Sequence, residues 1–217
     1  MTHGSYALAN GRAIIAIVGR KGGAGKTTTA LNLAGAFVEA GRDVHLIDLD
    51  PQQSLSRLLA HGPLRVPVLA LGANAEMHAA QGDVADWLRR LLPSDGYVII
   101  DTPPHLGVIM DAAIAVADRS LLPTRLAQQD IDSLLDTLEH CSAGALIVPN
   151  AVAARRRIHQ EMITSLRDAY PGQIAARSIP DSVIVEEALN TGMPVVRYAR
   201  RSAPAAAYRA LAQEVAR

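Results

Sequence analysis

The sequence of 217 residues is poor in cysteine, lysine and aromatic residues, and these shortages narrow what the protein can be. A single cysteine, Cys141, excludes an intramolecular disulfide and a metal site built on a cysteine pair, and the seven histidines follow no metal-ligand spacing. No run of about 18 apolar residues occurs, and residues 1–13 lack the charged start and apolar stretch of a secretory signal. We therefore expect a cytoplasmic protein, with a hydrophobic content of 49% that is sufficient for one sizeable core.

The net charge of zero conceals an uneven distribution of charge along the chain. Residues 1–150 carry eleven basic and fifteen acidic side chains, whereas residues 151–217 carry ten arginines and six acidic side chains. A basic segment of this kind is either an ordinary solvated surface or a binding surface for an anionic partner such as nucleic acid.

The chain contains only two lysines against nineteen arginines, and both lie in the stretch VGRKGGAGKTT, residues 18–28. A compact ammonium fits between phosphate oxygens where a planar guanidinium does not, so Lys21 and Lys26 indicate a phosphate-binding site. The usual phosphate-loop pattern G-x-x-x-x-G-K-[ST] nevertheless requires a glycine where this chain has Arg20. The stretch is therefore a chance glycine cluster, a damaged loop or a genuine variant of the motif.

The residues around this stretch have the order strand, glycine loop, helix that a phosphate loop needs. Residues 13–18 form a short apolar run typical of a buried parallel strand, and residues 26–40 place apolar side chains at helical spacing. Lys26 is then expected to reach the β- and γ-phosphates of a nucleotide, and Thr27 to bind Mg²⁺. Three glycines allow backbone N–H groups to approach anionic oxygens, namely Gly22, Gly23 and Gly25.

Strand and helix patterns alternate along the rest of the chain, which predicts an α/β fold with a mainly parallel, seven- to eight-stranded sheet and helices on both faces. We expect a single P-loop NTPase domain over residues 1–217, with residues 1–12 as a flexible extension and with loops at residues 59–68 and 70–83. Strands are predicted at residues 13–18, 43–50, 97–101, 120–124 and 145–150, and a less regular one at residues 66–71. Further helices are predicted at residues 54–60, 83–92, 108–117, 129–141, 155–168, 183–190 and 203–216.

Acidic residues at the carboxyl ends of strands are candidate metal or water ligands, because ligands of such sheets collect there. Asp101 follows the run YVII, and Asp48 and Asp50 end the strand predicted at residues 43–50. The i, i+2 spacing of Asp48 and Asp50 directs both side chains to one side if the strand continues, so one suits the metal shell and the other the attacking water. A single acid in such a place is more often a helix or turn cap, but together with the glycine loop the three favour a metal site.

The stretch KGGAGKTT, residues 21–28, resembles the deviant Walker A motif K-G-G-x-G-K-[ST]-T of the ParA/MinD group of P-loop ATPases. In that group a residue other than glycine is tolerated at the position of Arg20, and the additional lysine, here Lys21, is the signature. In length the chain is most similar to the small ParA-type partition ATPases that lack an N-terminal DNA-binding domain. The similarity covers almost the whole chain, including LIDLDPQQSLS, YVIIDTPPHLG, LLPTRLAQQDIDSLLDTLE and ALNTGMPVVRYARRSAPAAAYRALAQEV.

The resemblance implies that the cofactors are ATP and Mg²⁺, and it implies roles for individual residues. Lys21 reaches across a dimer interface to the ATP of the other subunit, like an arginine finger, whereas Lys26 binds the phosphates in its own subunit. Thr28 contacts the α-phosphate, and Asp50 positions the hydrolytic water. The implied catalytic residues are Lys21, Lys26 and Asp50, and the implied metal ligands, the two acids acting through metal-bound water, are Thr27, Asp48 and Asp101. The implied ATP contacts are Lys21, Gly22, Gly23, Ala24, Gly25, Lys26, Thr27 and Thr28, with Asn150, Pro180 and Asp181 at the adenine.

The resemblance also implies a switch that forms a homodimer with ATP and positions a cargo such as a plasmid, a chromosomal region or a protein assembly. Hydrolysis is expected to be slow until an adaptor of the ParB type stimulates it. DNA of any sequence, and hence the nucleoid, is expected to bind arginines of the C-terminal third through phosphate contacts that salt weakens. Several members of the group carry a DNA-contacting arginine where this chain has Ile184. The arginines expected to contact DNA are Arg155, Arg156, Arg157, Arg197, Arg200, Arg201 and Arg209.

Three other functions are weighed against this one. A MinD-like membrane ATPase needs a C-terminal amphipathic helix with bulky apolar residues, and YRALAQEVAR offers mostly alanine, so we expect no stable membrane association. Iron–sulfur relatives need paired cysteines, which one Cys141 per chain does not supply. An ATP-dependent small-molecule kinase or ligase on the same fold needs a second substrate pocket, for which Arg125 or His105 are the candidates.

Overall fold

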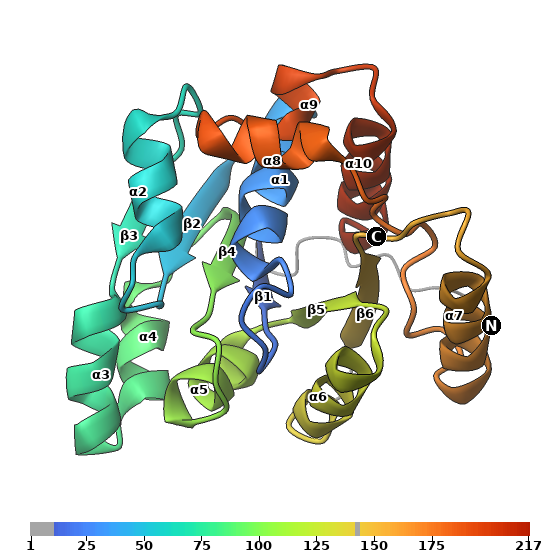
Figure 1. Cartoon of the computed structure of the whole chain (residues 1–217). Coiled ribbons are helices and arrows are strands. Elements are labelled where there is room, and N and C mark those ends of the chain that lie inside the picture. Colours follow the sequence, from blue (N-terminus) through green and yellow to red (C-terminus); the bar gives the residue numbers. More distant parts are fainter. Residues whose placement is uncertain (1–10, 142–143) are drawn as a thin grey trace.

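The computed structural model describes residues 11–141 and 144–217, which form one α/β domain around a six-stranded parallel sheet (Figure 1). The strand order is β3-β2-β4-β1-β5-β6, so β1 lies inside the sheet between β4 and β5. Because all neighbours are parallel, the carboxyl ends of the strands meet at one edge. The strands are β1 (Arg12–Ile17), β2 (Val44–Asp48), β3 (Val68–Ala70), β4 (Gly96–Asp101), β5 (Arg119–Arg125) and β6 (Ala145–Asn150).

Ten helices of the described residues cover the two faces of this sheet. They are α1 (Lys26–Glu39), α2 (Ser54–His61), α3 (Gly72–Gln81), α4 (Val84–Leu91), α5 (Val108–Val116), α6 (Gln128–Leu138), α7 (Arg157–Ala169), α8 (Val183–Asn190), α9 (Val195–Tyr198) and α10 (Ala203–Val215). One apolar core joins the sheet to α1, α2, α8, α9 and α10, and a second joins it to α3 to α7. Figure 1 shows the first group of helices above the sheet and α3 to α6 below it.

Side-chain alternation along the central strand explains why there are two cores. In β1, Ile15 and Ile17 belong to the core under α1, whereas Ile14 and Ala16 belong to the opposite core. The strands are therefore nearly continuous apolar runs, as expected for a parallel sheet covered on both sides.

The register of the strands brings the candidate acids to the same level. Ile17 of β1 is paired with Asp101 of β4, and Asp101 is paired on its other side with Asp48 of β2. The glycine loop leaves β1 at this level and leads directly into α1. Consequently the loop and both acids lie together at the carboxyl edge.

The prediction of an α/β domain with a mainly parallel sheet is confirmed, with a smaller number of strands than expected. All six strands predicted individually are present, but the described residues add no seventh or eighth. Beyond β6 the chain makes only isolated bridges, Ile147 with Ile174 and Val152 with Pro180. A proline has no backbone N–H, so Pro180 cannot extend a ladder of hydrogen bonds.

The prediction of a loop at residues 70–83 is wrong, because residues 72–81 form the helix α3. The error has a physical reason: only Gly72 and Ala75 of this helix are buried, so its sequence has little helical periodicity. Tertiary contacts hold it instead. The ring of His78 stacks on Trp87 of α4 with a centroid distance of 4.5 Å and lies 2.8 Å from a carboxylate oxygen of Asp83.

The predicted extension of residues 1–12 falls largely on residues 1–10, which lie outside the described part of the chain; Arg12 begins β1. Across the described ranges, we find no helix whose length and apolar character would let it cross a bilayer.

The close packing between α1 and α9 at Gly35, in the middle of α1, can be tested by substitution. A Cβ added to Gly35 would lie 2.3 Å from Cβ of Pro194 and 3.2 Å from a methyl group of Val196. Helix propensity favours alanine over glycine by about 1 kcal/mol, but overpacking of a core costs about 1–3 kcal/mol. We therefore expect Gly35→Ala to lower the free energy of unfolding in urea. Ala206→Gly on the exposed side of α10 is the control for propensity and should also destabilise; a Gly35→Ala protein more stable than wild type would contradict this packing.

Candidate functional site

The glycine loop connects β1 to α1 in a backbone conformation that requires glycine at particular positions. Gly23 and Gly25 have φ values of 75° and 99°, in the left-handed region, and α1 begins immediately after Gly25. Arg20 is not among the described residues with positive φ, so its conformation is open to any residue. Its side chain forms an ion pair with Asp136 of α6, and its backbone N–H donates to Oγ1 of Thr137 at 3.3 Å. This explains why the position of the missing glycine can hold an arginine.

Asn150 at the end of β6 braces the loop from one side. Its amide Nδ2 donates to the carbonyl oxygen of Ala24 at 2.8 Å, while its Oδ1 accepts from the N–H of Ala151 at 2.9 Å. A Cβ on Gly25 would lie 2.2 Å from the same amide nitrogen, so the loop passes in direct contact with Asn150. Ala151 has a φ of 51°, an uncommon conformation for a non-glycine residue.

The two lysines of the loop lie in different surroundings. Lys26 is 7% exposed, lines the large cavity described below, and its ammonium donates to the carbonyl oxygen of Lys21 at 3.2 Å. Burial lowers the pKa of Lys26, and the charges of Asp101 and Asp50 oppose this shift. Lys21 does not line that cavity; its side chain is 40% exposed and its Nζ lies 2.5 Å from Oδ1 of the buried Asp130 of α6.

Asp101 at the end of β4 is fully buried and only half satisfied. Its Oδ2 accepts a hydrogen bond of 2.7 Å from Oγ1 of Thr27, whereas its Oδ1 has no hydrogen-bond partner among the described residues. Burial raises the pKa of Asp101 to about 7 against the effect of the Thr27 hydrogen bond, and Asp48 adds to the increase. Oδ1 is therefore the oxygen through which Asp101 could hold a hydrated cation.

Asp48 and Asp50 have separate environments. Asp48 is buried and its carboxylate is taken up by the protein: Oδ2 accepts from the N–H and the hydroxyl of Ser56 at 2.9 and 2.8 Å, and Oδ1 accepts from the N–H of Asp50. Asp50 is partly exposed, accepts from the N–H of Gln52 at 2.9 Å and lines the cavity. Asp48 thus caps the start of α2, and Asp50 is the acid that a bound ligand can touch.

A cavity of about 430 Å³ lies between the glycine loop and the residues that precede α8. It is large enough for a nucleotide, since small-molecule pockets span about 300–1,000 Å³. The segment at Pro180 is held beside β6, because Ile179 donates to the carbonyl oxygen of Pro149 and Asp181 donates to that of Val152. The predicted site residues that line the cavity are Gly22, Gly23, Gly25, Lys26, Thr27, Thr28, Asp50, Asn150, Pro180 and Asp181.

Four predicted residues lie outside the cavity lining. Asp48 and Asp101 are buried behind it, and Lys21 and Ala24 face a small space of about 10 Å³ next to α6. Among the described residues no group of three or more His, Cys, Asp and Glu side chains could hold a metal by itself. A divalent cation would therefore bind at Thr27 and Asp101 together with the phosphates of a ligand, which is the usual arrangement for Mg²⁺.

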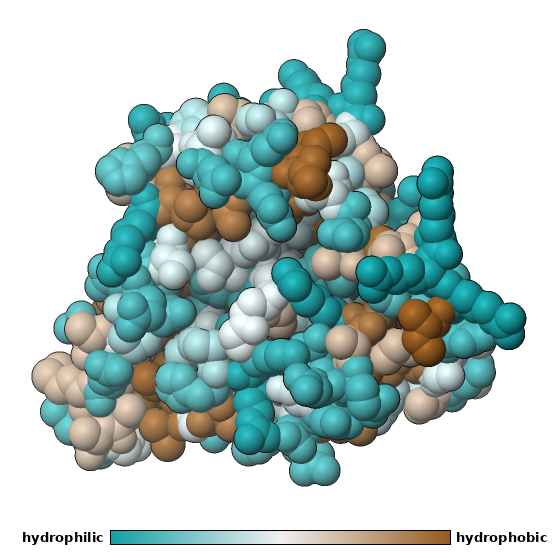
Figure 2. Space-filling view, in the orientation of Figure 1, coloured by the Kyte–Doolittle hydropathy of each residue, from teal (hydrophilic) through white to brown (hydrophobic). Residues whose placement is uncertain are grey.

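The predicted DNA-binding arginines fall into two groups on the surface. Arg155, Arg156 and Arg157 are exposed where α7 begins, and the second group surrounds α9 and the start of α10. In Figure 2, long hydrophilic side chains project from the surface in both of these regions. The second group is Arg197, Arg200, Arg201 and Arg209, of which only Arg209 is partly buried.

Several residues of the site were not predicted from the sequence. Asp130, the partner of Lys21, and Ser56, the partner of Asp48, are each one of several polar residues in a helix, and nothing in the sequence singles them out. Arg125 was considered only for another function, yet it ends β5 in register with Asn150 and lines the cavity. Only its place at the carboxyl end of a strand could have indicated it.

Comparison with known protein families gives an extensive match. The family described as the CobQ/CobB/MinD/ParA nucleotide binding domain matches residues 15–195 of this chain. The chromosome-partitioning ATPase Soj of Thermus thermophilus is 32% identical over 93% of this chain and 94% of its own length. The chromosome partitioning protein ParA of Myxococcus xanthus is 28% identical over 93% of this chain and 87% of its own length.

Comparison with solved structures gives a match of the whole fold. The structure of apo McdA from Cyanothece superposes with a TM-score of 0.77 and covers 94% of this chain and 99% of its own. Since the identity is only 23%, this likeness concerns the fold.

The hydrogen bond from Asn150 to Ala24 can be tested for its effect on the geometry of the loop. Asn150→Leu keeps the branched shape of the side chain but removes the donor to Ala24, so we expect the loop to loosen and the affinity for a fluorescent ATP analogue to fall about tenfold. Asn74→Leu on the exposed face of α3 is the matched control and should leave the affinity unchanged. Equal affinities for Asn150→Leu and wild type, with both proteins folded, would show that the brace does not support ligand binding.

Proposed function

This chain belongs to the CobQ/CobB/MinD/ParA family of nucleotide-binding domains, and from that premise we propose that it is a ParA-type ATPase that dimerises on ATP, binds DNA of any sequence and positions a cargo. The names of its relatives, a chromosome-partitioning ATPase and a chromosome partitioning protein, support partition as the process. The cargo is a plasmid, a chromosomal region or a protein assembly, selected by an adaptor of the ParB type.

The observation that carries the proposal is the separation of the two lysines. Lys26 faces the cavity of its own subunit, whereas Lys21 points away from it and is held by Asp130. From this position the ammonium of Lys21 does not contact a nucleotide bound in the cavity of its own subunit. We therefore assign Lys21 to the nucleotide of a second subunit, where it exchanges the carboxylate of Asp130 for phosphate oxygens. Two triphosphates can then face each other because lysines from both subunits neutralise them.

Within one subunit the residues of the cavity divide the work of binding ATP. Backbone N–H groups of Gly22, Gly23 and Gly25 and the start of α1 hold the phosphates, together with Lys26. Thr28 contacts the α-phosphate, and Pro180 and Asp181 line the opposite wall, where the adenine lies. Asn150 also lines the cavity, but its amide group is engaged in hydrogen bonds with Ala24 and Ala151. It therefore contacts the adenine by van der Waals packing rather than by a hydrogen bond.

Hydrolysis needs a neutralised phosphate and an oriented water. Mg²⁺, when bound with ATP, neutralises phosphate charge, and Thr27 and the free oxygen of Asp101 would hold the ion. Asp50 lies at the cavity and orients the attacking water. Asp48 would act on the ion only through metal-bound water, and its hydrogen bonds with Ser56 also fix the strand end. Since Lys21 is withdrawn from its own cavity, a lone subunit lacks one cation of the catalytic site. Slow turnover that rises only in the dimer and with an adaptor follows from this arrangement.

DNA binding is proposed from the exposed arginines at α7 and near α9. They form no base-reading motif, so they contact phosphates and bind any sequence. Dimerisation doubles the number of such contacts, which makes DNA binding dependent on ATP, and on the nucleoid this couples the nucleotide state to position. A membrane-associated role is disfavoured by α10, because its apolar residues, including Tyr208, Leu211 and Val215, are buried in the core.

The dimer is tested by measuring molar mass with light scattering in the presence of ATP and Mg²⁺ or of ADP. We expect wild-type protein to double its mass only with ATP. Lys21→Ala should bind ATP and stay monomeric, whereas Lys26→Ala should lose ATP binding itself. Arg20→Ala, which changes the neighbouring exposed side chain, is the matched control and should dimerise. A Lys21→Ala protein that dimerises as well as wild type would refute the role given to Lys21.

DNA binding is tested by fluorescence anisotropy with a duplex of arbitrary sequence, in ATP and Mg²⁺ at several salt concentrations. Removing both Arg200 and Arg201 by substitution with alanine should weaken binding and reduce the slope of log K against log salt by about 1.8, or about 0.9 for each lost phosphate contact. The control removes Arg89 and Arg90, exposed arginines of α4. An unchanged slope after loss of Arg200 and Arg201 would exclude this surface.

A further inference from the structure

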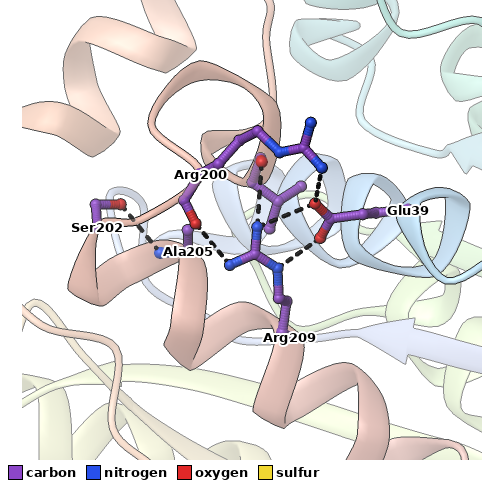
Figure 3. Close-up of polar contacts among 6 residues, drawn as sticks. Glu39, Arg200, Ser202, Ala205 and Arg209 are labelled. Carbon is purple, nitrogen blue, oxygen red and sulfur yellow. Dashed lines mark hydrogen bonds and ion pairs between the residues drawn. The ribbon is translucent and has the colours of Figure 1, made fainter.

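Three charged side chains meet where the end of α1 lies against the turn between α9 and α10 (Figure 3). Glu39 is the last residue of α1, Arg209 lies in α10, and Arg200 lies in the turn itself. The cluster contains two guanidinium groups and one carboxylate, so one of the two arginines can be satisfied fully and the other only partly.

Arg209 uses all of its nitrogen atoms on the protein. Its Nε and Nη2 donate to the two carboxylate oxygens of Glu39 at 2.5 and 3.0 Å, and its Nη1 donates to the carbonyl oxygen of Arg200 at 2.7 Å. Nη2 also reaches the carbonyl oxygen of Val196 at 3.4 Å. The hydrogen bond from Arg209 lowers the pKa of Glu39 and so stabilises the ionised carboxylate. This two-point contact fixes the orientation of both side chains.

Arg200 is in the opposite situation. Its side chain is 74% exposed, and within the described residues its guanidinium makes only an ion pair of 3.5 Å with Glu39. Its backbone carbonyl, in contrast, is held by Arg209. The neighbouring Arg201 is also exposed. On the other side of the turn, Ser202 caps α10, its Oγ accepting from the N–H of Ala205 at 3.3 Å (Figure 3). The backbone of the turn is therefore fixed while its two arginines face solvent.

We propose that Glu39 and Arg209 are positioning residues that hold the turn of residues 199–202 against the end of α1, so that Arg200 and Arg201 present their guanidinium groups to the phosphates of a nucleic-acid backbone. This rests on the DNA binding of the proposed function. It changes the role of Arg209, which was expected to contact DNA: with its donors engaged by Glu39, Arg200 and Val196, Arg209 supports the contact residues instead.

Positioning and simple electrostatics make opposite predictions for Glu39. If Glu39 only screens the arginines, its neutralisation leaves one more positive charge on the surface and DNA binds more tightly. If Glu39 anchors Arg209, its neutralisation loosens the turn and DNA binds less tightly. Arg209→Lys also distinguishes the two hypotheses, because lysine keeps the charge but cannot form the two-point contact. Simple electrostatics predicts unchanged DNA binding for this variant, and positioning predicts weaker binding.

The experiment measures duplex DNA binding by anisotropy, in ATP and Mg²⁺, for wild type, Glu39→Gln, Arg209→Lys and the double variant. We expect each single variant to bind DNA about fivefold more weakly and the double variant no more weakly than either, because both substitutions break one contact. ATP affinity and thermal midpoint should stay near wild type. Glu161→Gln is the matched control: Glu161 pairs with Arg157, at 2.7 Å, without holding a turn, so its neutralisation should leave DNA binding equal or tighter.

Tighter DNA binding by Glu39→Gln, as in the control, would overturn the proposal. A loss of ATP affinity equal to the loss of DNA affinity would also overturn it, because the contact would then serve the fold as a whole. Amide hydrogen exchange of residues 199–202 gives a measurement that does not depend on DNA. Exchange should be faster in both single variants than in wild type, and equal rates would refute the positioning role of Glu39 and Arg209. If wild-type protein binds no DNA at low salt, the DNA part of the proposed function fails. The exchange rates alone then test whether Glu39 and Arg209 hold the turn.

Discussion

The hydrogen bond from the amide of Asn150 to the carbonyl oxygen of Ala24 is the contact on which the geometry of the phosphate loop depends. The loop has no regular secondary structure, so its backbone must be fixed by its neighbours. Asn150 holds it on one side, Asp101 holds Thr27 through a hydrogen bond of 2.7 Å on another, and Asp130 holds Lys21 at α6. All three partners come from elements whose positions the parallel sheet determines. The sheet therefore positions the loop, and the loop positions the N–H groups that face the cavity.

The charges at the site are arranged so that a ligand completes them. Lys26 and Asp101 are both buried. Burial lowers the pKa of Lys26 and raises that of Asp101, so it favours the neutral form of each. Anionic phosphate beside Lys26 and a cation beside Asp101 would favour the charged form of each. Ligand binding that satisfies these groups also stabilises the folded state, because the unfolded chain offers no such site. The same reasoning applies to the role we propose for Lys21, which has one carboxylate partner in this chain and would exchange it for a phosphate partner in a second subunit.

Much of the fold could be predicted from the sequence because the features that determine it are local. The apolar runs of β1 and β4 and the glycines before α1 carry their own signals, and the strand ends at Asp48, Asp101 and Asn150 locate the edge. The helix α3 could not be predicted, since it has little periodicity and is held by tertiary contacts, among them the stacking of His78 on Trp87 and the burial of Ala75. In the site, the loop residues carry a motif, whereas Asp130 and Ser56 act through spatial proximity to Lys21 and Asp48. Their roles arise only after the chain has folded.

Arg209 shows why charge in a sequence does not identify a binding surface. It belongs to the basic C-terminal third, as Arg200 and Arg201 do, but its donors point inward to Glu39 and to two carbonyl groups. What decides the role of an arginine is the number of donors left for a ligand, and for Arg209 that number is set by a carboxylate 170 residues away in the chain. The same carboxylate ends the helix that begins at Lys26, about 21 Å away for a helix of 14 residues. Helix α1 thus carries the proposed phosphate site at its first residue and the anchor of residues 199–202 at its last, so the two proposed anion-binding regions share a common support although they share no residue.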